Sequence, residues 1–275
     1  MTLRRREVLV KLARKRDALI VCDDVYDFLQ WPLEGDPTPE RPPELRLPRL
    51  CDIDLAMGPA ANDPQGFGHA VSNGSFSKIS GPGVRTGWVE ASPAFVTGLS
   101  KTASTMSGGA PSQLCAGILS DMVRTGELEK HIETRVRPSL QRRHRLMMDA
   151  IREFLVPLGV QTRQSSLAGS QVYWGYFVWL TLPPGHPLPT TAVAEIAMDE
   201  ENLVIGYGNM FEVLGDEDSA RFDADIRLCF AWESEESLVE GVQRLARLLK
   251  RMRDNRELYQ PRVGGAQAPG VDTFK

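Results

Sequence analysis

The chain has 275 residues, a formal net charge of −4 and 42% apolar residues. This length allows one or two domains, and the composition is that of an ordinary globular protein. The mildly acidic balance argues against nucleic acid as the main partner, and no apolar run is long enough to span a bilayer.

The start of the chain, Met1–Arg6, is basic but is not followed by the apolar region of a signal peptide. His131 and His144 are expected at the surface. The cysteines lack the spacing of a metal site, and three of them lie in apolar surroundings. We therefore expect no metal ion, buried free thiols and a reducing compartment, the cytoplasm. The four cysteines are Cys22, Cys51, Cys115 and Cys229.

The first predicted elements alternate between helix and strand. Apolar residues at helical spacing predict a helix over 5–16 whose basic face is solvated. The apolar run 18–22 predicts a strand buried on both faces, and 69–74 and 86–91 predict two more strands. Prolines crowd 31–48 and indicate an irregular surface segment.

Helices dominate the middle of the chain. The pair Ser92-Pro93 is typical of a helix start, and a second helix is predicted over 111–125. The apolar pattern over 127–155 predicts a long helix, and Pro138 must kink it because proline cannot continue the hydrogen-bond ladder.

The last part of the chain mixes strands and helices. Aromatic and β-branched residues make 172–180 the strongest predicted strand. The other predicted elements are a helix over 191–201, strands over 203–205 and 226–230, and a helix from the Ser234 cap to about Met252.

Lys78 lies among small and hydroxylated residues in the stretch 74–88. A lysine that forms a Schiff base must be reachable and must lose its proton, which a dry pocket or a nearby cation favours. Ser75, Ser77 and Arg85 carry donors that a phosphate group needs. A lysine with phosphate donors suggests pyridoxal phosphate (PLP). The alternative is a solvated lysine beside a Gly-Pro-Gly turn.

A second candidate set follows the first predicted strand. Asp23 and Asp24 close the apolar run, and Tyr26 stands three residues after the first of them. Ligands of open α/β sheets bind outside the carboxyl ends of the strands. A carboxylate there can pair with a protonated pyridine nitrogen, and Tyr26 could donate to the phenolic oxygen of the ring. The alternative for both aspartates is a turn or a helix cap.

Three motifs in this order resemble the class I/II aminotransferases of PLP fold type I: Asp23-x-x-Tyr26, Ser75-Phe76-Ser77-Lys78 and Pro82-Gly83-Val84-Arg85-x-Gly87-Trp88. The resemblance is closest to the branch of 2-aminoadipate, kynurenine and aromatic aminotransferases, which is shared with the effector domains of MocR-type regulators. It implies that Lys78 binds PLP and moves a proton, that Asp23 pairs with the pyridine nitrogen, and that Tyr26 donates to the ring oxygen. It also implies that the phosphate is held by Ser75, Ser77 and Arg85.

A fourth match is the segment 226–230, since an Arg-x-x-Phe strand of the family binds the substrate α-carboxylate. The resemblance gives this role to Arg227, whose guanidinium can bind both carboxylate oxygens. Taken alone, Arg227 would be an ordinary strand arginine. Gly175 matches a family glycine near the substrate, whereas Trp174 replaces the usual glycine before it and could narrow the site.

The resemblance extends to about Asp254 and implies an α/β fold of PLP fold type I. Its parts would be a partial large domain over 1–135 with a mainly parallel sheet, a small α+β domain over 136–257 and a loose tail over 258–275. Family members carry an N-terminal part with a Gly-Ser/Thr-Gln loop, a stacking aromatic residue and an Asn-Pro-x-Gly motif, none of which occurs in 1–17. We therefore expect unpaired strand edges and uncovered apolar faces.

The function implied by the resemblance is amino transfer between an amino acid and a 2-oxo acid such as 2-oxoglutarate, in a homodimer and impaired by truncation. Two alternatives stay open. One is another fold type I PLP enzyme, such as a lyase or a synthase. The other is an inactive remnant or a module that depends on a partner chain.

Overall fold

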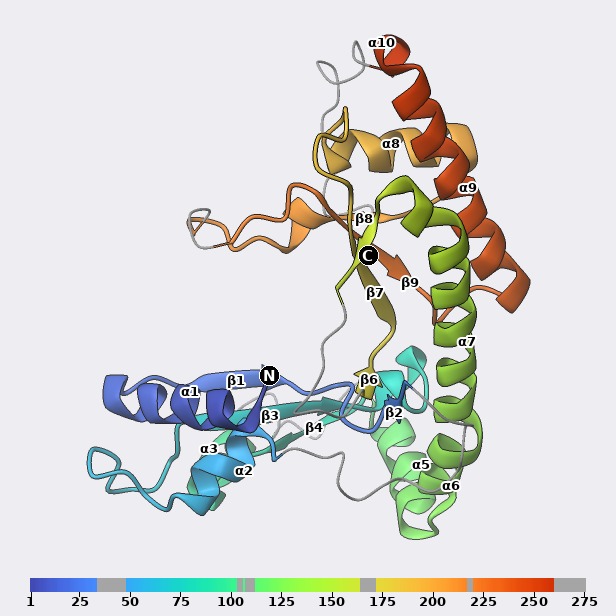
Figure 1. Ribbon diagram of the computed structural model, residues 1–275. Coiled ribbons are helices and arrows are strands. Elements are labelled where there is room, and N and C mark those ends of the chain that lie inside the picture. The colour runs from blue at the N-terminus through green and yellow to red at the C-terminus, as the bar shows by residue number, and fades with distance from the viewer. Residues whose placement is uncertain (34–47, 103–105, 107–111, 164–171, 217–219, 260–275) are drawn as a thin grey trace. The chain divides into compact units, whose positions relative to one another are not determined.

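The computed structural model describes residues 1–33, 48–102, 106, 112–163, 172–216 and 220–259 (Figure 1). The chain divides into two compact units. Unit 1 comprises Met1–Pro138 and Ser165–Gly175, and unit 2 comprises Ser139–Gln164 and Tyr176–Lys275. The predicted loose end of the chain, over 260–275, lies outside the described residues.

Unit 1 combines short strands with helices on a mixed sheet. Its elements are α1 (Leu3–Arg16), β1 (Ile20–Asp23), β2 (Gln30–Pro32), α2 (Leu50–Ala56), β3 (Ala70–Ser75), the 3₁₀ turns η2 (Phe76–Lys78) and η3 (Pro82–Val84), β4 (Gly87–Glu90), α3 (Pro93–Ser100), α5 (Gln113–Arg124), α6 (Glu127–His131), the π-helical turn η4 (Ile132–Val136) and β6 (Val172–Trp174). The predicted start of α3 is confirmed, since the Ser92 hydroxyl accepts a hydrogen bond from the Phe95 N–H at 3.1 Å.

The main sheet of unit 1 has the strand order β1-β3-β4. β1 and β3 run parallel, with Asp23 opposite Asn73, and β3 and β4 run antiparallel, with Ser75 opposite Gly87. Residues of α1 and α2 form one buried cluster with Ala70 of β3. These two helices therefore cover one face of the sheet.

The prediction that the first strand is buried on both faces is wrong. Ile20 and Cys22 pack against the core cluster, but Val21 is 65% exposed because alternate strand residues point to opposite faces. An uncovered apolar position of this kind fits the expectation of uncovered apolar faces.

Trp88 of β4 lies directly against the backbone of β3. A Cβ added to Gly74 would lie 2.2 Å from the Trp88 ring, so only glycine fits there. The Trp88 ring also meets Phe76 edge-on, with 4.9 Å between the ring centroids. Gly74 therefore places an aromatic ring immediately behind the turn that carries Lys78.

The long predicted helix over 127–155 is interrupted. α6 passes through the π-helical turn η4 into α7 (Arg137–Ala150), and a second π-helical turn, η5 (Ile151–Leu155), follows. The first interruption lies immediately before Pro138, whose missing N–H cannot extend the hydrogen-bond ladder.

His144 of α7 is buried, with 3% of its surface exposed, and its ring lies 5.3 Å from the ring of Phe230. Burial lowers the pKa of His144 to about 4, because charging a buried imidazole is costly. The prediction of a surface position is therefore wrong for His144, whereas His131 is exposed.

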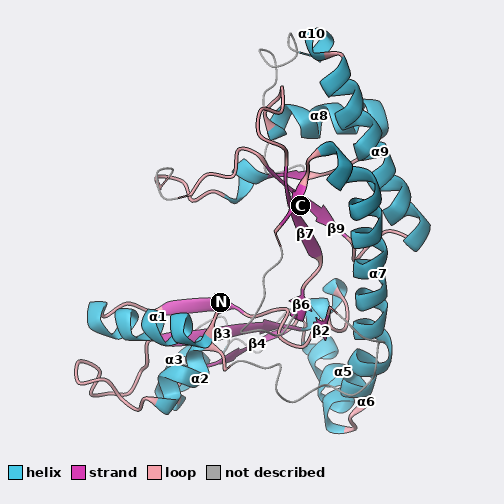
Figure 2. Ribbon diagram, in the orientation of Figure 1, coloured by secondary structure: helices cyan, strands magenta, loops and turns pink. Residues whose placement is uncertain are grey.

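Unit 2 contains an antiparallel sheet with the strand order β5-β7-β9-β8. Its elements after η5 are η6 (Val156–Leu158), β5 (Gln161–Thr162), β7 (Phe177–Thr181), α8 (Thr190–Glu201), β8 (Gly206–Tyr207), the 3₁₀ turn η7 (Gly208–Phe211), β9 (Asp225–Cys229), α9 (Glu235–Asp254) and α10 (Arg256–Tyr259). Figure 2 shows the helices α8 and α9 of this unit beside its strands. Alternate residues of β7 and β9 are buried, among them Val178, Leu180, Ile226 and Leu228.

The single strand predicted over 172–180 is wrong, because Gly175 divides it. Gly175 has φ +89°, a conformation that ends a strand and that glycine adopts without strain. β6 before it pairs with β2, and β7 after it pairs with β5 and β9. The strand predicted over 203–205 is also wrong, since pairing begins only at Gly206.

All four cysteines are free thiols, as expected, but only Cys51 is buried, whereas Cys22 and Cys115 are partly buried and Cys229 is exposed. Burial raises the pKa of Cys22 and of Cys51 to about 11, so both stay protonated at neutral pH. Within the described residues, no helix is long and apolar enough to cross a bilayer. The same part of the chain contains no group of three or more potential metal ligands.

Candidate active site

Polar side chains gather where β1 and β3 end. Because these strands are parallel, their carboxyl ends meet at one edge of the sheet, which we call the carboxyl edge. Asp23 is exposed there, and the Asn73 amide donates to its Oδ1 at 3.1 Å. Ser75, two residues after Asn73, projects from the same face because strand side chains alternate. The sheet thus aligns a carboxylate, an amide and a hydroxyl on one face.

Asp24 has a different position from Asp23. Its carboxylate accepts a hydrogen bond from the Ser72 hydroxyl at 2.7 Å, and its backbone N–H donates to the Asn73 carbonyl at 3.0 Å. Asp24 therefore ties the end of β1 to β3, in line with the structural alternative that the sequence left open.

Lys78 is the last residue of η2, the 3₁₀ turn that follows β3 directly. Ser75 caps this turn, since its Oγ accepts a hydrogen bond from the Ser77 N–H at 3.1 Å. The capping bond uses Ser75 Oγ as an acceptor, so the hydroxyl retains a hydrogen that can be donated. Lys78 is partly buried, and its Nζ lies 5.8 Å from the centre of the Tyr26 ring. The structure thus brings Lys78 and Tyr26 together.

Arg85 holds an unusual backbone conformation just before β4. Its φ of 47° and ψ of 39° are left-handed, which costs a residue with a Cβ about 1 kcal/mol. The exposed side chain turns back, and its Nη1 donates to the Pro82 carbonyl at 2.9 Å. Since Gly87 pairs with Ser75, Arg85 lies at the carboxyl edge. Strained residues that persist in a fold are typical of functional sites.

Gly175 lies against the ring of Tyr26. A Cβ added to Gly175 would lie 3.7 Å from the nearest ring carbons, and the Gly175 N–H donates to the Leu29 carbonyl at 3.4 Å. Trp174 pairs with Gln30 and is partly buried. The segment 172–175 thus packs beside the residues that follow β1.

Arg227 belongs to unit 2. It lies in the middle of β9, opposite Trp179 of β7 and Gly206 of β8. Its Cζ lies 4.0 Å from the ring centre of Phe177 and 4.1 Å from that of Phe211. Arg227 is therefore stacked against aromatic rings. The sequence pattern indicated an arginine in a strand but did not indicate these ring contacts.

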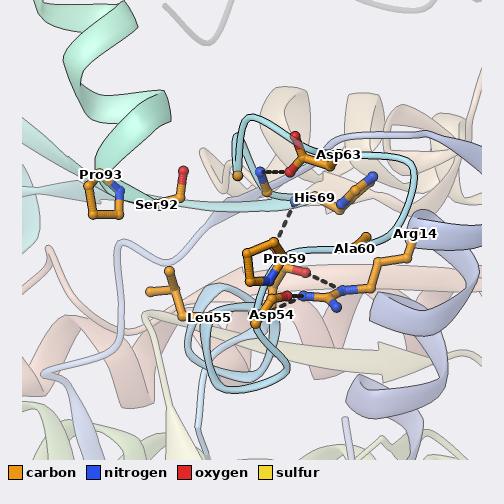
Figure 3. Close-up of a pocket in the computed structure, with 12 residues that line it drawn as sticks. Arg14, Asp54, Leu55, Pro59, Ala60, Asp63, His69, Ser92 and Pro93 are labelled. Atoms are coloured by element: carbon orange, nitrogen blue, oxygen red, sulfur yellow. Dashed lines mark hydrogen bonds and ion pairs between the residues drawn. The ribbon is translucent and has the colours of Figure 1, made fainter.

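A cavity of about 200 Å³ lies at the opposite, amino edge of the sheet in unit 1 (Figure 3). Its charged and titratable groups come from Arg14, Asp54, Asp63 and His69, and His69 immediately precedes β3. Arg14 Nε contacts Asp54 Oδ1 at 2.7 Å, and its Nη2 donates to the Gly58 carbonyl at 2.8 Å. The other carboxylate oxygen of Asp54 accepts from the His69 N–H at 2.6 Å.

These contacts tie the end of α1 to α2 and to the loop before β3. Asp54 is buried and Arg14 is partly buried, and the guanidinium of Arg14 donates to the Asp54 carboxylate and to the Asp54 and Gly58 carbonyls. We assign no cofactor role to this cavity.

Sequence reasoning missed three residues around the candidate groups. Asn73 became visible only through the register of β1 and β3, and Phe177 and Phe211 only through the folding of unit 2.

A second cavity, of about 430 Å³, borders η2 in unit 1. Phe28, Phe76 and Trp88 supply its aromatic lining. Lys78 does not line it, so this cavity lies behind the lysine turn.

The family model for aminotransferases of class I and II matches residues 2–245. The uncharacterized protein YER152C of Saccharomyces cerevisiae is 36% identical over 217 residues, which cover 78% of this chain and 45% of that protein. Aromatic-amino-acid aminotransferase 1 of Thermococcus litoralis is 29% identical over 255 residues, which cover 91% of this chain and 50% of that enzyme. The chain thus spans about half the length of these relatives.

A solved structure gives the same result. LysN, the α-aminoadipate aminotransferase of Thermus thermophilus, was solved in complex with N-(5′-phosphopyridoxyl)-L-leucine. It matches 90% of this chain and 54% of its own chain, with a TM-score of 0.61 and 25% identity. The fold is therefore that of the PLP fold type I aminotransferases, and the chain belongs to the PLP-dependent class I and II aminotransferase family.

Proposed function

We propose that this chain carries the cofactor site and the carboxylate site of a PLP-dependent aminotransferase, which transfers an amino group between an amino acid and a 2-oxo acid. The observation that carries the proposal is the position of Lys78 and Asp23 at the same carboxyl edge, with Tyr26 beside the lysine. This is the edge at which open α/β sheets bind ligands.

The residues at the carboxyl edge fit PLP. A carboxylate that is exposed and oriented by an amide suits a pyridine nitrogen, and Asp23 with Asn73 provides this arrangement. Ser75 Oγ–H and the Arg85 guanidinium are donors of the kind that hold a phosphate. Ser77 adds a third donor from the same turn. A lysine follows on that turn and can hold the cofactor covalently.

PLP, when bound, supplies an electron sink for the electron pair that remains when a bond to the substrate α-carbon breaks. Lys78 Nζ would take the proton from the substrate α-carbon as a general base and would pass it, as a general acid, to the cofactor carbon that receives the amino group. The Asp23 carboxylate keeps a proton on the pyridine nitrogen, and the Tyr26 hydroxyl donates to the ring oxygen.

The substrate is held by its carboxylate. Arg227 binds the α-carboxylate through its planar fork, which orients the bond that breaks. Gly175 leaves room beside Tyr26, and Trp174 narrows that space compared with a glycine. Relatives named aromatic-amino-acid aminotransferase and 2-aminoadipate transaminase support an amino acid with an aromatic or acidic side chain as donor, and the family resemblance supports 2-oxoglutarate as acceptor.

We extend the proposal to the organisation of the protein. The large domain comprises 1–135, the small domain 136–257 and the tail 258–275. The active form is a homodimer. The free thiols suit a reducing compartment, and we propose the cytoplasm.

A transamination assay tests the proposal. The purified chain is incubated with PLP, 2-oxoglutarate and, in turn, L-2-aminoadipate, L-kynurenine and L-phenylalanine, and glutamate formation is measured. We expect glutamate with at least one donor, none with Lys78→Ala, and an unchanged rate with Lys130→Ala, which removes an exposed lysine. Glutamate formation by Lys78→Ala at the wild-type rate would refute the role of Lys78.

The exposed apolar residues of unit 1 favour a second candidate, a module that a partner polypeptide completes. Val21 of β1 is 65% exposed, and Leu114 of α5 is 80% exposed. Apolar positions of this kind are typical of surfaces that another segment covers. Light scattering coupled to size exclusion, with and without PLP, separates the two candidates. A folded monomer that does not bind PLP favours the partner-dependent module, whereas a PLP-binding dimer favours the enzyme.

A further inference from the structure

The guanidinium of Arg227 lies close to two aromatic rings. Phe177 comes from β7 and Phe211 ends the turn that follows β8, and these two strands flank β9 on opposite sides. Both ring centres lie within 4.1 Å of Arg227 Cζ. The two rings therefore approach the guanidinium from the two sides of its own strand.

The two faces of the unit 2 sheet around Arg227 differ in how deeply their side chains are buried. Phe177, Trp179 and Arg227 project from one face of the sheet and are only partly buried. Leu180 and Ile226 project from the other face and are fully buried. An arginine on the partly exposed face can reach a ligand, whereas one on the core face could not.

A second layer of rings fixes Phe211. The Trp179 ring meets Phe211 edge-on, with 5.3 Å between centroids, and it meets Phe222 in the same manner at 5.5 Å. Edge-to-face contacts of this kind stabilise one ring orientation. The position of Phe211 over Arg227 is therefore set by packing within unit 2.

Stacking constrains how the guanidinium can bind a ligand. Its five N–H donors lie in one plane, so a ring stacked on a face of that plane leaves the donors to act through the edge. A carboxylate needs this edge for a bidentate contact. A long side chain that is already held in one orientation loses less conformational freedom when it binds.

We infer that Phe177 and Phe211 are positioning residues that hold Arg227 ready for a carboxylate, so that unit 2 carries a pre-formed carboxylate site. The inference rests on the proposed function, because Arg227 must be the group that binds the substrate carboxylate. It adds that the site is set by two aromatic rings and does not require PLP to be in place.

The test uses the full chain without PLP and 3-phenylpropionate as a carboxylate probe. Calorimetry gives the dissociation constant, and the Arg227 Nε–H signal in a proton–nitrogen NMR spectrum, assigned with Arg227→Lys, reports ring stacking. We expect Phe211→Leu to weaken probe binding about fivefold. It should also move the Nε–H signal downfield, away from its ring-shifted position.

Two variants serve as controls, and a third replaces Phe211→Leu if that variant does not fold. Phe211→Tyr keeps the ring and is expected to retain both the affinity and the NMR shift. Leu214→Ala alters an exposed apolar residue of unit 2, and it is expected to leave the affinity within about twofold. If Phe211→Leu does not fold, Phe177→Leu takes its place with the same expected result.

Two results would overturn the inference. If Arg227→Lys lowers the affinity but loss of the ring leaves affinity and NMR signal unchanged, the rings do not position Arg227, although its proposed role stands. If Arg227→Lys binds the probe as the wild type does, Arg227 is not the carboxylate ligand. Both the proposed role of Arg227 and the inference about the rings then fail. A chain that shows the ring effect but never binds PLP would support the inference and refute the PLP-dependent function.

Discussion

The two edges of the unit 1 sheet each carry an aspartate, and the two aspartates differ in burial. At the amino edge, Asp54 is buried and shared between the Arg14 guanidinium and the His69 N–H. At the carboxyl edge, Asp23 is exposed and is held by the Asn73 amide. One aspartate is enclosed by the fold, and the other is oriented by it.

This difference in burial distinguishes a carboxylate that stabilises the fold from one that is accessible to a ligand. A buried ion pair is costly to break, because the remaining charge is left uncompensated in a low-dielectric interior. An exposed carboxylate contributes little to stability, because water screens it. Asp23 is nevertheless oriented, on a face that it shares with Ser75, which supports its proposed role in binding a ligand.

The largest effect on stability is expected for Asp54→Asn. The substitution removes the negative charge beside Arg14, and we expect a loss of about 3 kcal/mol in the free energy of unfolding. Urea denaturation followed by circular dichroism measures it. Asp23→Asn is the matched control and should change the same quantity by less than about 0.5 kcal/mol. Equal losses in the free energy of unfolding from the two substitutions would contradict the distinction between Asp54 and Asp23.

The second prediction concerns His144, a buried titratable group in unit 2, and the dependence of stability on pH. Its pKa in the folded protein is about 4, below the 6.5 of an ordinary histidine, so only the unfolded chain takes up this proton as pH falls below 6.5. The stability that neutral His144 supports is complete above pH 6.5 and is lost between about pH 6.5 and 4. We expect a loss of about 2 kcal/mol from this group between pH 7 and pH 5.

His144→Gln tests this prediction in urea denaturation at pH 7 and pH 5. The variant should lose about 2 kcal/mol less than the wild type over this range. His131→Gln alters an exposed histidine and should follow the wild type. A His144→Gln variant with the full acid sensitivity of the wild type would show that other groups account for it.

A smaller loss of stability than for Asp54→Asn or for protonation of His144 is expected for Arg85→Gly at the carboxyl edge. Glycine adopts the left-handed conformation of this position without strain but orders more chain on folding, so the free energy of unfolding should change by no more than about 1 kcal/mol. PLP affinity should nevertheless fall about tenfold or more, because a charged donor to the phosphate is lost. Fluorescence titration with PLP measures the affinity, and wild-type affinity in this variant would exclude Arg85 from the phosphate site.

Much of the fold follows from local patterns. The Ser92 and Ser234 caps, the helix that begins at Ser234 and the strand around Arg227 could be predicted because each depends on a short stretch of sequence. The division at Gly175 could not be predicted, because a run of strand-forming residues does not reveal a positive φ at one glycine.

The candidate site was only partly predictable for the same reason. Its chemical groups stand in short motifs, but their orientation depends on strand pairing between residues about 50 positions apart, such as Asp23 and Asn73. The Arg49–Glu90 pair, with a bidentate contact at 2.6 and 2.7 Å, and the rings around Arg227 also join distant segments. One sequence contains no direct signal for such pairings.

The most direct test of the central claim is to map where PLP attaches. The purified chain is mixed with PLP, reduced with borohydride, digested and analysed by mass spectrometry, with Lys78→Ala and Lys130→Ala in parallel. The account predicts a phosphopyridoxyl group on Lys78 in the wild type and in Lys130→Ala, and none on that peptide in Lys78→Ala. A folded wild-type chain that carries no label on Lys78, or that labels exposed lysines equally, would contradict the assignment of the carboxyl edge as the cofactor site.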